Sequence, residues 1–164
     1  MAMADNGNEA RPAAAGGQQS LSVVAQYVKD LSFESPGAPQ SVRARAGAPS
    51  INIGVNVQSR PLQGGELEVE LRIDAQAREG ESVLFAIELV YGGLFRLANI
   101  SSENVALVAM IQCPQLLFPF ARQIIADASR NGGFPPLLID PIDFVQLYRQ
   151  RVAQMNAGQQ GANA

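Results

Sequence analysis

Three glutamates alternate with apolar residues along the segment 66–73, and their spacing is the one pattern in the chain that could support acid–base chemistry. Histidine is absent, so carboxylates would have to carry any proton transfer alone. Side chains two apart on a strand share a face, which places Glu66, Glu68 and Glu70 together. Catalysis by such a set needs cationic or apolar neighbours that separate the pKa values, and the pattern supplies none. We interpret this set as a solvated strand face, and we expect no catalytic residue and no enzymatic activity.

The sequence supports metal or cofactor chemistry no better than it supports acid–base catalysis. Cys113 is the one cysteine, and without a histidine or a second cysteine it lacks the partners of a nucleophile or a zinc site. The glycine patterns of phosphate-binding loops are absent, and Gly64-Gly65 and Gly92-Gly93 are explained by turns or bulges. The sequence therefore predicts no metal and no cofactor, and Cys113 is expected to be a buried thiol.

The strongest functional signal is an apolar connector at 134–139, which lies between two predicted helices. Pro135 and Pro136 prevent a helix there, and the composition is too apolar for a solvated loop. Beside a helix and a sheet, such a connector would border a groove that suits extended apolar peptide. For each residue taken alone, ordinary core packing remains an alternative. The predicted groove residues are Phe85, Phe118, Phe120, Phe134, Leu137 and Leu138.

Period-two alternation predicts the strands that would support this groove. Four strands are expected, over 21–33, 51–58, 66–75 and 83–91, and Gly92-Gly93 is expected to break the last ladder. With helices following the strands, the predicted fold is α+β, a four-stranded antiparallel sheet with helices packed on one face.

Proline, glycine and capping residues predict three helices. The first starts at Ser101 or Ser102 and runs to Ile111, where Cys113-Pro114 ends or kinks it. The second begins near Pro114 to Pro119 and stops at Gly132-Gly133. The third runs from Pro141 to about Met155, with Asp140 as its N-cap.

Two elements are more apolar than a small monomer needs. The strand over 83–91 is largely apolar on both faces, and the helix over 105–111 has no polar stripe. Because a single small domain cannot cover all of this surface, the pattern predicts an oligomer. The predicted interface residues are Ile87, Leu89, Tyr91, Val105 and Val108.

Composition narrows the class of protein. The chain of 164 residues is long enough for one domain, predicted at 21–155, with disordered tails at 1–20 and 156–164. Its net charge is −3 and its single lysine is Lys29, which argues against nucleic-acid binding. No apolar run approaches 20 residues and the N-terminus lacks a signal-peptide pattern, so we expect a cytoplasmic protein without membrane insertion.

Three motifs in this order resemble one known family. They are YVKDLSFESPGAP at Tyr27–Pro39, YGGLF at Tyr91–Phe95 and CPQLLFPFARQIIADASRNGGFPPLLIDPIDF at Cys113–Phe144. The last is similar to the hallmark segment of SecB, the bacterial protein-export chaperone, and the resemblance covers roughly residues 23–152.

The resemblance implies a function, partners and sites. The family holds precursor proteins unfolded without ATP and delivers them to the motor SecA, as a homotetramer built as a dimer of dimers. Its client grooves involve the second helix and the connector, and a tryptophan often found after the first strand is missing here, near Ala46. The resemblance places SecA docking at Asp30, Glu34, Ala86 and Glu88.

Two other functions remain as alternatives. One is a SecB-like chaperone dedicated to a single client such as an antitoxin. The other is a small oligomeric sheet protein that binds a discrete apolar ligand.

Overall fold

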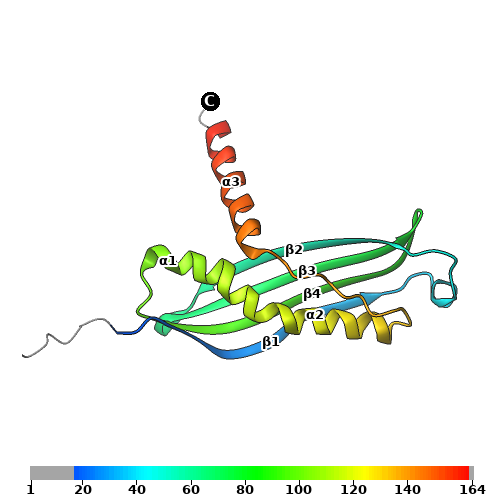
Figure 1. Cartoon of the computed structure of the whole chain (residues 1–164), viewed down its shortest axis with the longest axis horizontal. Coiled ribbons are helices and arrows are strands. Elements are labelled where there is room, and N and C mark those ends of the chain that lie inside the picture. Colours follow the sequence, from blue (N-terminus) through cyan, green and yellow to red (C-terminus); the bar gives the residue numbers. More distant parts are fainter. Residues whose placement is uncertain (1–16, 163–164) are drawn as a thin grey trace, which may run out of the picture.

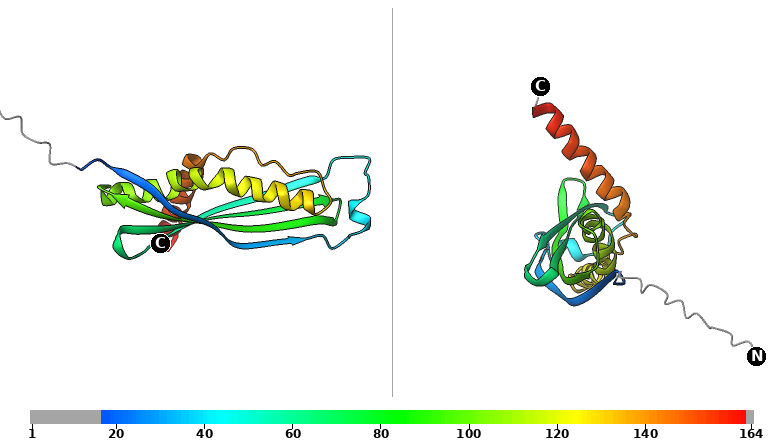
Figure 2. Two further views of the ribbon diagram at one scale, coloured as in Figure 1. Left: turned by 90° about the horizontal axis from the view of Figure 1, so that it is seen from below. Right: turned by 90° about the vertical axis from the view of Figure 1, so that its left-hand side faces the viewer.

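The computed structural model describes residues 17–162, which form a long sheet with helices on one face (Figures 1 and 2). The strands are β1 (Ser20–Glu34), β2 (Ser50–Pro61), β3 (Glu66–Glu79) and β4 (Ser82–Ala98). Their order in the sheet is β1-β4-β3-β2, and each neighbouring pair is antiparallel. The predicted fold class is confirmed. Residues 1–16 of the predicted N-terminal tail lie outside the described part.

Strand β4 does not end at Gly92-Gly93, so the predicted break in the ladder is wrong. The strand continues to Ala98, and the two glycines make room on opposite faces. A Cβ atom on Gly92 would lie 2.5 Å from the ring of Tyr27, and one on Gly93 would lie 2.5 Å from Phe95 and 2.8 Å from Leu117. The space that these glycines leave is therefore occupied by Tyr27 of β1 and Leu117 of α2, and by Phe95 of β4 itself.

The first two helices form one path across the sheet. Helix α1 (Ser102–Leu107) passes through a π-helical turn (Val108–Gln112) into α2 (Cys113–Asn131). The wide turn lies where Pro114, which lacks an N–H group, would interrupt a regular helix. The path is locally irregular there but does not end, and Pro119 lies inside α2. Residues 102–131 are long and apolar enough to cross a membrane by length and composition, but α2 uses this apolar surface to pack on the sheet.

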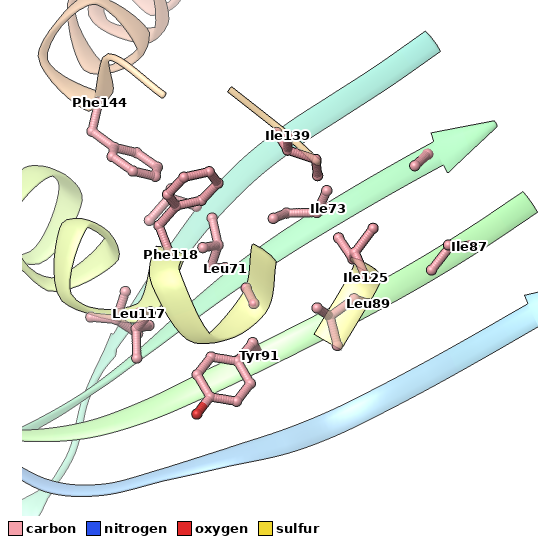
Figure 3. Close-up of a cluster of buried hydrophobic side chains, with 14 of the residues drawn as sticks. Leu71, Ile73, Ile87, Leu89, Tyr91, Leu117, Phe118, Ile125, Ile139 and Phe144 are labelled. Atoms are coloured by element: carbon pink, nitrogen blue, oxygen red, sulfur yellow. The ribbon is translucent and has the colours of Figure 1, made fainter. Parts of the chain in front are cut away.

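The core lies between α2 and the strands β3 and β4 (Figure 3). Ile87 and Leu89 are fully buried there beneath α2, and Tyr91 is almost fully buried. These three were predicted to be subunit contacts, but the helix of the same chain already covers them. The prediction failed because an apolar strand pattern does not reveal which layer covers it.

Helix α3 (Phe144–Ala162) projects away from the sheet (Figures 1 and 2). It begins three residues later than predicted, because Asp143, not Asp140, accepts the capping hydrogen bond, from the Gln146 N–H at 3.0 Å. Near its base the Arg151 guanidinium donates to the Val57 carbonyl at 2.5 Å. The helix also includes residues 156–162, which were predicted to be a disordered tail, and residues 163–164 lie outside the described part.

Candidate functional site

A cavity of about 550 Å³ opens between the connector after α2 and the loop that joins β1 to β2. Both segments lie at the same end of the sheet, over the beginning of β4 (Figure 1). Its volume falls within the range of ligand-binding pockets, and most of its lining is apolar. The lining side chains include Val42, Ala44, Ala48, Pro49, Ile51, Leu84, Phe85, Phe134 and Leu137.

Two aromatic rings that line the cavity, those of Phe85 and Phe134, pack with a third ring, Phe33, which does not line it. Phe85 and Phe134 have ring centroids 4.8 Å apart, and Phe33 lies 5.8 Å from Phe85 and 6.4 Å from Phe134. They come from β1, β4 and the connector, so the aromatic cluster joins segments that are far apart in the sequence. The cluster gives the cavity a rigid apolar floor.

Ser129 holds the connector against α2. Its Oγ accepts a hydrogen bond from the Leu137 N–H at 2.8 Å and donates within its own helix to the carbonyls of Ile125 and Ala126, each at 3.0 Å. The Phe134 N–H donates to the Ser129 carbonyl at 3.1 Å. The connector therefore has a fixed backbone although its prolines cannot donate hydrogen bonds.

Two glycines let the chain turn into the connector. A Cβ atom on Gly132 would lie 2.1 Å from the ring of Phe33, and Gly133 has φ +89°, a left-handed conformation that favours glycine. Without them the end of α2 could not approach β1 this closely.

The structure brings together Phe85, Phe134 and Leu137, but not the other predicted groove residues. Phe118 is buried in the core, where its ring meets that of Phe144 edge-on at 6.2 Å. Phe120 and Leu138 are exposed and do not line the cavity.

The other wall of the cavity, the loop over 41–49, was not predicted from the sequence. The signal was its run of Ala and Gly with Pro49, since side chains this small cannot fill the space beside them.

The face of the sheet opposite the helices carries a group of carboxylates. The register pairs Ser32 with Glu88 across β1 and β4, and side chains two residues away on a strand share the face, so Asp30 and Glu34 flank this pair. Glu34 is paired with Ala86, so all four predicted docking residues lie in one region. All three carboxylates are exposed.

Asp74 belongs to this group, although it was not predicted from the sequence. The register pairs Asp74 with Glu88 across β3 and β4, which makes it a fourth exposed carboxylate of the same region. None of the ion pairs found within residues 17–162 involves any of the four. We call Asp30, Glu34, Asp74 and Glu88 the acidic patch.

The other half of this face is neutralised. Glu68 is only 7% exposed and accepts hydrogen bonds from the Tyr27 hydroxyl at 2.6 Å, from Lys29 at 3.0 Å and from Arg60 at 2.6 Å. Lys29 also pairs with Glu70. The hydrogen bonds from Tyr27 and Lys29 lower the pKa of Glu68 to about 2, while burial and the bond to Glu68 raise the pKa of Tyr27 to about 12.

A third surface, on the helix side of the sheet, is apolar and exposed. Val28 pairs with Tyr91 across β1 and β4, and the Tyr91 ring stacks on Phe120 of α2 at 6.4 Å between centroids. Tyr91 is thus covered mainly by its own chain, whereas Val28 and Phe120 remain exposed to solvent. Of the two helix residues predicted at an interface, Val105 is half-buried and Val108 is buried. The exposed apolar residues on this side include Val23, Val28, Leu31, Leu107, Leu116 and Phe120.

Residues 17–162 contain no cluster of His, Cys, Asp and Glu that could hold a metal. Cys113 is fully buried, and burial raises the pKa of its thiol to about 12. The thiol therefore stays protonated at neutral pH and is unsuited to nucleophilic attack.

The family model and the similar sequences indicate the same family. The family model for SecB, preprotein translocase subunit SecB, matches residues 14–155. The protein-export protein SecB of Agrobacterium fabrum is 56% identical over 138 residues, which cover 84% of this chain and 86% of that protein. Its counterpart in Sinorhizobium fredii is 55% identical over 161 residues, which cover 98% and 94%.

One solved structure supports the fold alone. A SecB-like chaperone from Mycobacterium tuberculosis, solved with a peptide from an antitoxin, is similar at a TM-score of 0.62 and 11% identity, over 75% of this chain and 91% of that chain. The family model and the relatives spanning most of the sequence show that this chain belongs to the SecB family.

Proposed function

We propose that this chain is an ATP-independent chaperone that holds precursor proteins unfolded in the cytoplasm and delivers them to the export motor SecA. The observation that carries this proposal is the cavity formed by Phe85, Phe134, Leu137 and the 41–49 loop. The floor of the cavity is aromatic, and Ser129 fixes the backbone of the connector that borders it. The cavity is open enough for apolar side chains of an extended peptide.

Holding a client needs no chemical step. A chaperone that binds only unfolded chains lowers the concentration of folding-competent chains by mass action, and release restores folding. This fits a chain whose one thiol stays protonated and whose most buried carboxylate, Glu68, is occupied by three partners.

Delivery would use the acidic patch. The partner of the SecB family, SecA, carries a basic tail. The four exposed carboxylates of the patch have no ion-pair partners among the described residues and would attract this tail. Ala86 pairs with Glu34 in the register, so its small apolar side chain lies beside the carboxylates of the patch. The neutral cluster around Glu68 would limit docking to one half of the sheet face.

Assembly would use the apolar helix side. Side chains such as Val28, Leu116 and Phe120 are exposed in the single chain, and their burial between subunits would stabilise a homotetramer built as a dimer of dimers. Such an assembly would also place several client cavities within reach of one precursor, which raises the overall affinity.

The test is a refolding assay with the pure protein. The chain should slow the refolding of a precursor and leave its folded, mature form unaffected, without ATP. Delay of a single client among several precursors would favour the dedicated chaperone instead. A bound lipid in native mass spectrometry, with no delay of any precursor, would favour the apolar-ligand protein.

A further inference from the structure

The two walls of the client cavity are held in different ways. The connector is fixed through Ser129, which accepts hydrogen bonds from the backbone N–H groups of Phe134 and Leu137. The opposite wall includes most of residues 44–49, and no backbone hydrogen bond from this segment is found within residues 17–162. Every residue of the segment is exposed except Arg45, which is half-buried. Arg45 is therefore the one anchored residue of residues 44–49.

Arg45 connects this wall to the end of a strand and to the start of its own loop. Its guanidinium pairs with the Glu79 carboxylate, at the end of β3, at 3.1 Å, and it also donates to the Ser41 carbonyl. The side chain of Arg45 is only 16% exposed, so these contacts are partly shielded from water. A guanidinium can bond both partners at once because its N–H donors point in several directions.

Ser41 is itself a fixed point. It is 7% exposed, and its N–H donates to the Gly37 carbonyl at 2.9 Å. Its hydroxyl lies 3.2 Å from that of Ser35, which donates to the Leu84 carbonyl of β4 at 3.0 Å. Through Ser41 and Glu79, Arg45 is thus tied to β4 and β3, the two central strands of the sheet.

We infer that Arg45 is a positioning residue of the client cavity, which holds the segment 44–49 as a wall through Glu79 and Ser41. The inference rests on the proposed function, because it names the residue that keeps the client site in shape. Without this anchor the segment would move freely, and binding a peptide would then cost the ordering of its backbone. An anchored wall is already ordered before the peptide arrives.

The first measurement is the affinity of a short unfolded peptide with one central Phe, determined by fluorescence anisotropy. The peptide carries no charge, so it forms no ion pair of its own with the cavity. Arg45→Gln should bind it about twofold to fivefold more weakly, the size expected for one partly exposed ion pair. Glu79→Gln should also bind it more weakly. The double variant should lose no more than Arg45→Gln alone, because both changes break the same contact.

The second measurement follows the wall itself and separates positioning from a general loss of stability. A dye on Ala46→Cys reports local motion by time-resolved anisotropy, and Cys113 stays unlabelled because it is fully buried. Arg45→Gln should let the dye move more freely, while the midpoint of chemical unfolding stays near that of wild type.

Two variants are matched controls. Arg43→Gln removes the same charge from the lining of the same cavity, but Arg43 is exposed and takes part in none of the ion pairs found within residues 17–162. Glu81→Gln removes an exposed carboxylate close to Glu79 in the sequence that is likewise outside those ion pairs. Both variants should behave as wild type in the two measurements.

The possible failures are distinguishable. Wild-type affinity or unchanged dye motion in Arg45→Gln would overturn the inference, and so would an equal loss of affinity in Arg43→Gln or an additive loss in the double variant. Leu137→Ala tests the proposed function separately, because Leu137 lines the cavity from the connector. If Leu137→Ala weakens peptide binding, the proposed function stands whichever result Arg45→Gln gives. If neither variant weakens it, the cavity is not the client site and the inference falls with it.

Discussion

The Tyr27 hydroxyl donates to Glu68 Oε1 at 2.6 Å by reaching across the intervening strand. Tyr27 is on β1 and Glu68 on β3, and β4 lies between them with Gly92 beneath the tyrosine ring. A side chain at position 92 would block this path. Lys29 and Arg60 complete the ring of donors, so one carboxylate connects β1, β2 and β3 on the face that no helix covers.

Glu68 should contribute stability that acid removes. Its pKa of about 2 lies below the ordinary value of 4.5, so the contribution is present above pH 4.5 and is lost as the pH falls toward 2. Glu68→Gln should lower the free energy of unfolding at pH 7 by about 1 to 2 kcal/mol, and the difference from wild type should shrink near pH 3. Denaturant titrations at fixed protein concentration measure both values. Glu103→Gln, an exposed glutamate on α1, is the matched control, and an equal loss in the two variants would contradict the prediction.

Gly132 should resist replacement although its conformation allows alanine. Its φ of −74° is helical, and alanine would ordinarily be favoured there, but the new Cβ would lie 2.1 Å from the Phe33 ring. Gly132→Ala should therefore destabilise the protein by about 1 to 3 kcal/mol in thermal unfolding. Gly47→Ala, whose Cβ would meet nothing within 4 Å, should change little. A neutral Gly132→Ala would show that Phe33 moves freely.

The sequence predicted the elements well where one face was plainly apolar. In β3, the alternation of Leu67 to Ala75 with charged residues matches the observed faces except at Glu68. Glu68 was expected to be solvated, but it is buried because Tyr27, Lys29 and Arg60 surround its carboxylate. The prediction from the sequence failed at Gly92-Gly93. These glycines make room for the Tyr27 ring on one face and for Leu117 on the other, and only the folded chain brings those side chains close. Asp140 and Asp143 both suit an N-cap, and the path of the connector decides between them.

The residues of the candidate site were likewise predicted only in part. Phe134 and Leu137 were predicted because the connector could not be a solvated loop, but the same argument included Leu138, which is exposed. Phe118 and Phe120 were included because α2 borders the connector. Pattern alone could not show that the residues of α2 do not line the cavity. In the acidic patch, the family resemblance had already indicated Asp30, Glu34 and Glu88, whereas Asp74 needed the strand register that pairs it with Glu88.

Charge reversal in the acidic patch should impair docking and spare client binding. Glu88 lies at the centre of the patch, next to Asp74, so Glu88→Lys should weaken SecA binding about tenfold or more in calorimetry. Asp74→Asn should cause a smaller loss, and the wild-type affinity should fall as salt rises. Glu103→Lys makes the same charge change on α1 and should bind SecA as wild type does. Unchanged affinity of Glu88→Lys would move the docking site elsewhere.

Leu137 and Leu138 are neighbours with opposite expected roles. Leu137 lines the cavity, whereas Leu138 is 62% exposed and does not. Leu137→Ala should weaken binding of a short unfolded peptide about tenfold through lost apolar contact, and the anchoring bond from its N–H to Ser129 is kept. Leu138→Ala should have little effect. Long precursors should show a smaller loss of affinity, because several cavities of one assembly would bind them at once. Equal effects of the two variants would show that the cavity is not where the peptide binds.

Phe120 tests assembly without disturbing the core. It is 51% exposed and stacks on Tyr91, so a folded single chain should tolerate Phe120→Asp, whereas a charge buried between subunits would cost several kcal/mol. We expect the wild type to be a tetramer in light scattering and Phe120→Asp to be a dimer or monomer with unchanged circular dichroism. Leu89→Asp is unsuitable for this purpose, since Leu89 is fully buried beneath α2 and its replacement would unfold the chain.

Met155→Asp is the control for this assembly test, because Met155 is 58% exposed, slightly more than Phe120, but lies on the projecting helix α3. It should remain a tetramer, which would show that an added charge alone does not dissociate the assembly. A wild-type monomer at micromolar concentration would reject the oligomer. A tetrameric Phe120→Asp would instead place the subunit contact away from the surface around Val28, Leu116 and Phe120, and would leave those side chains without an assigned partner.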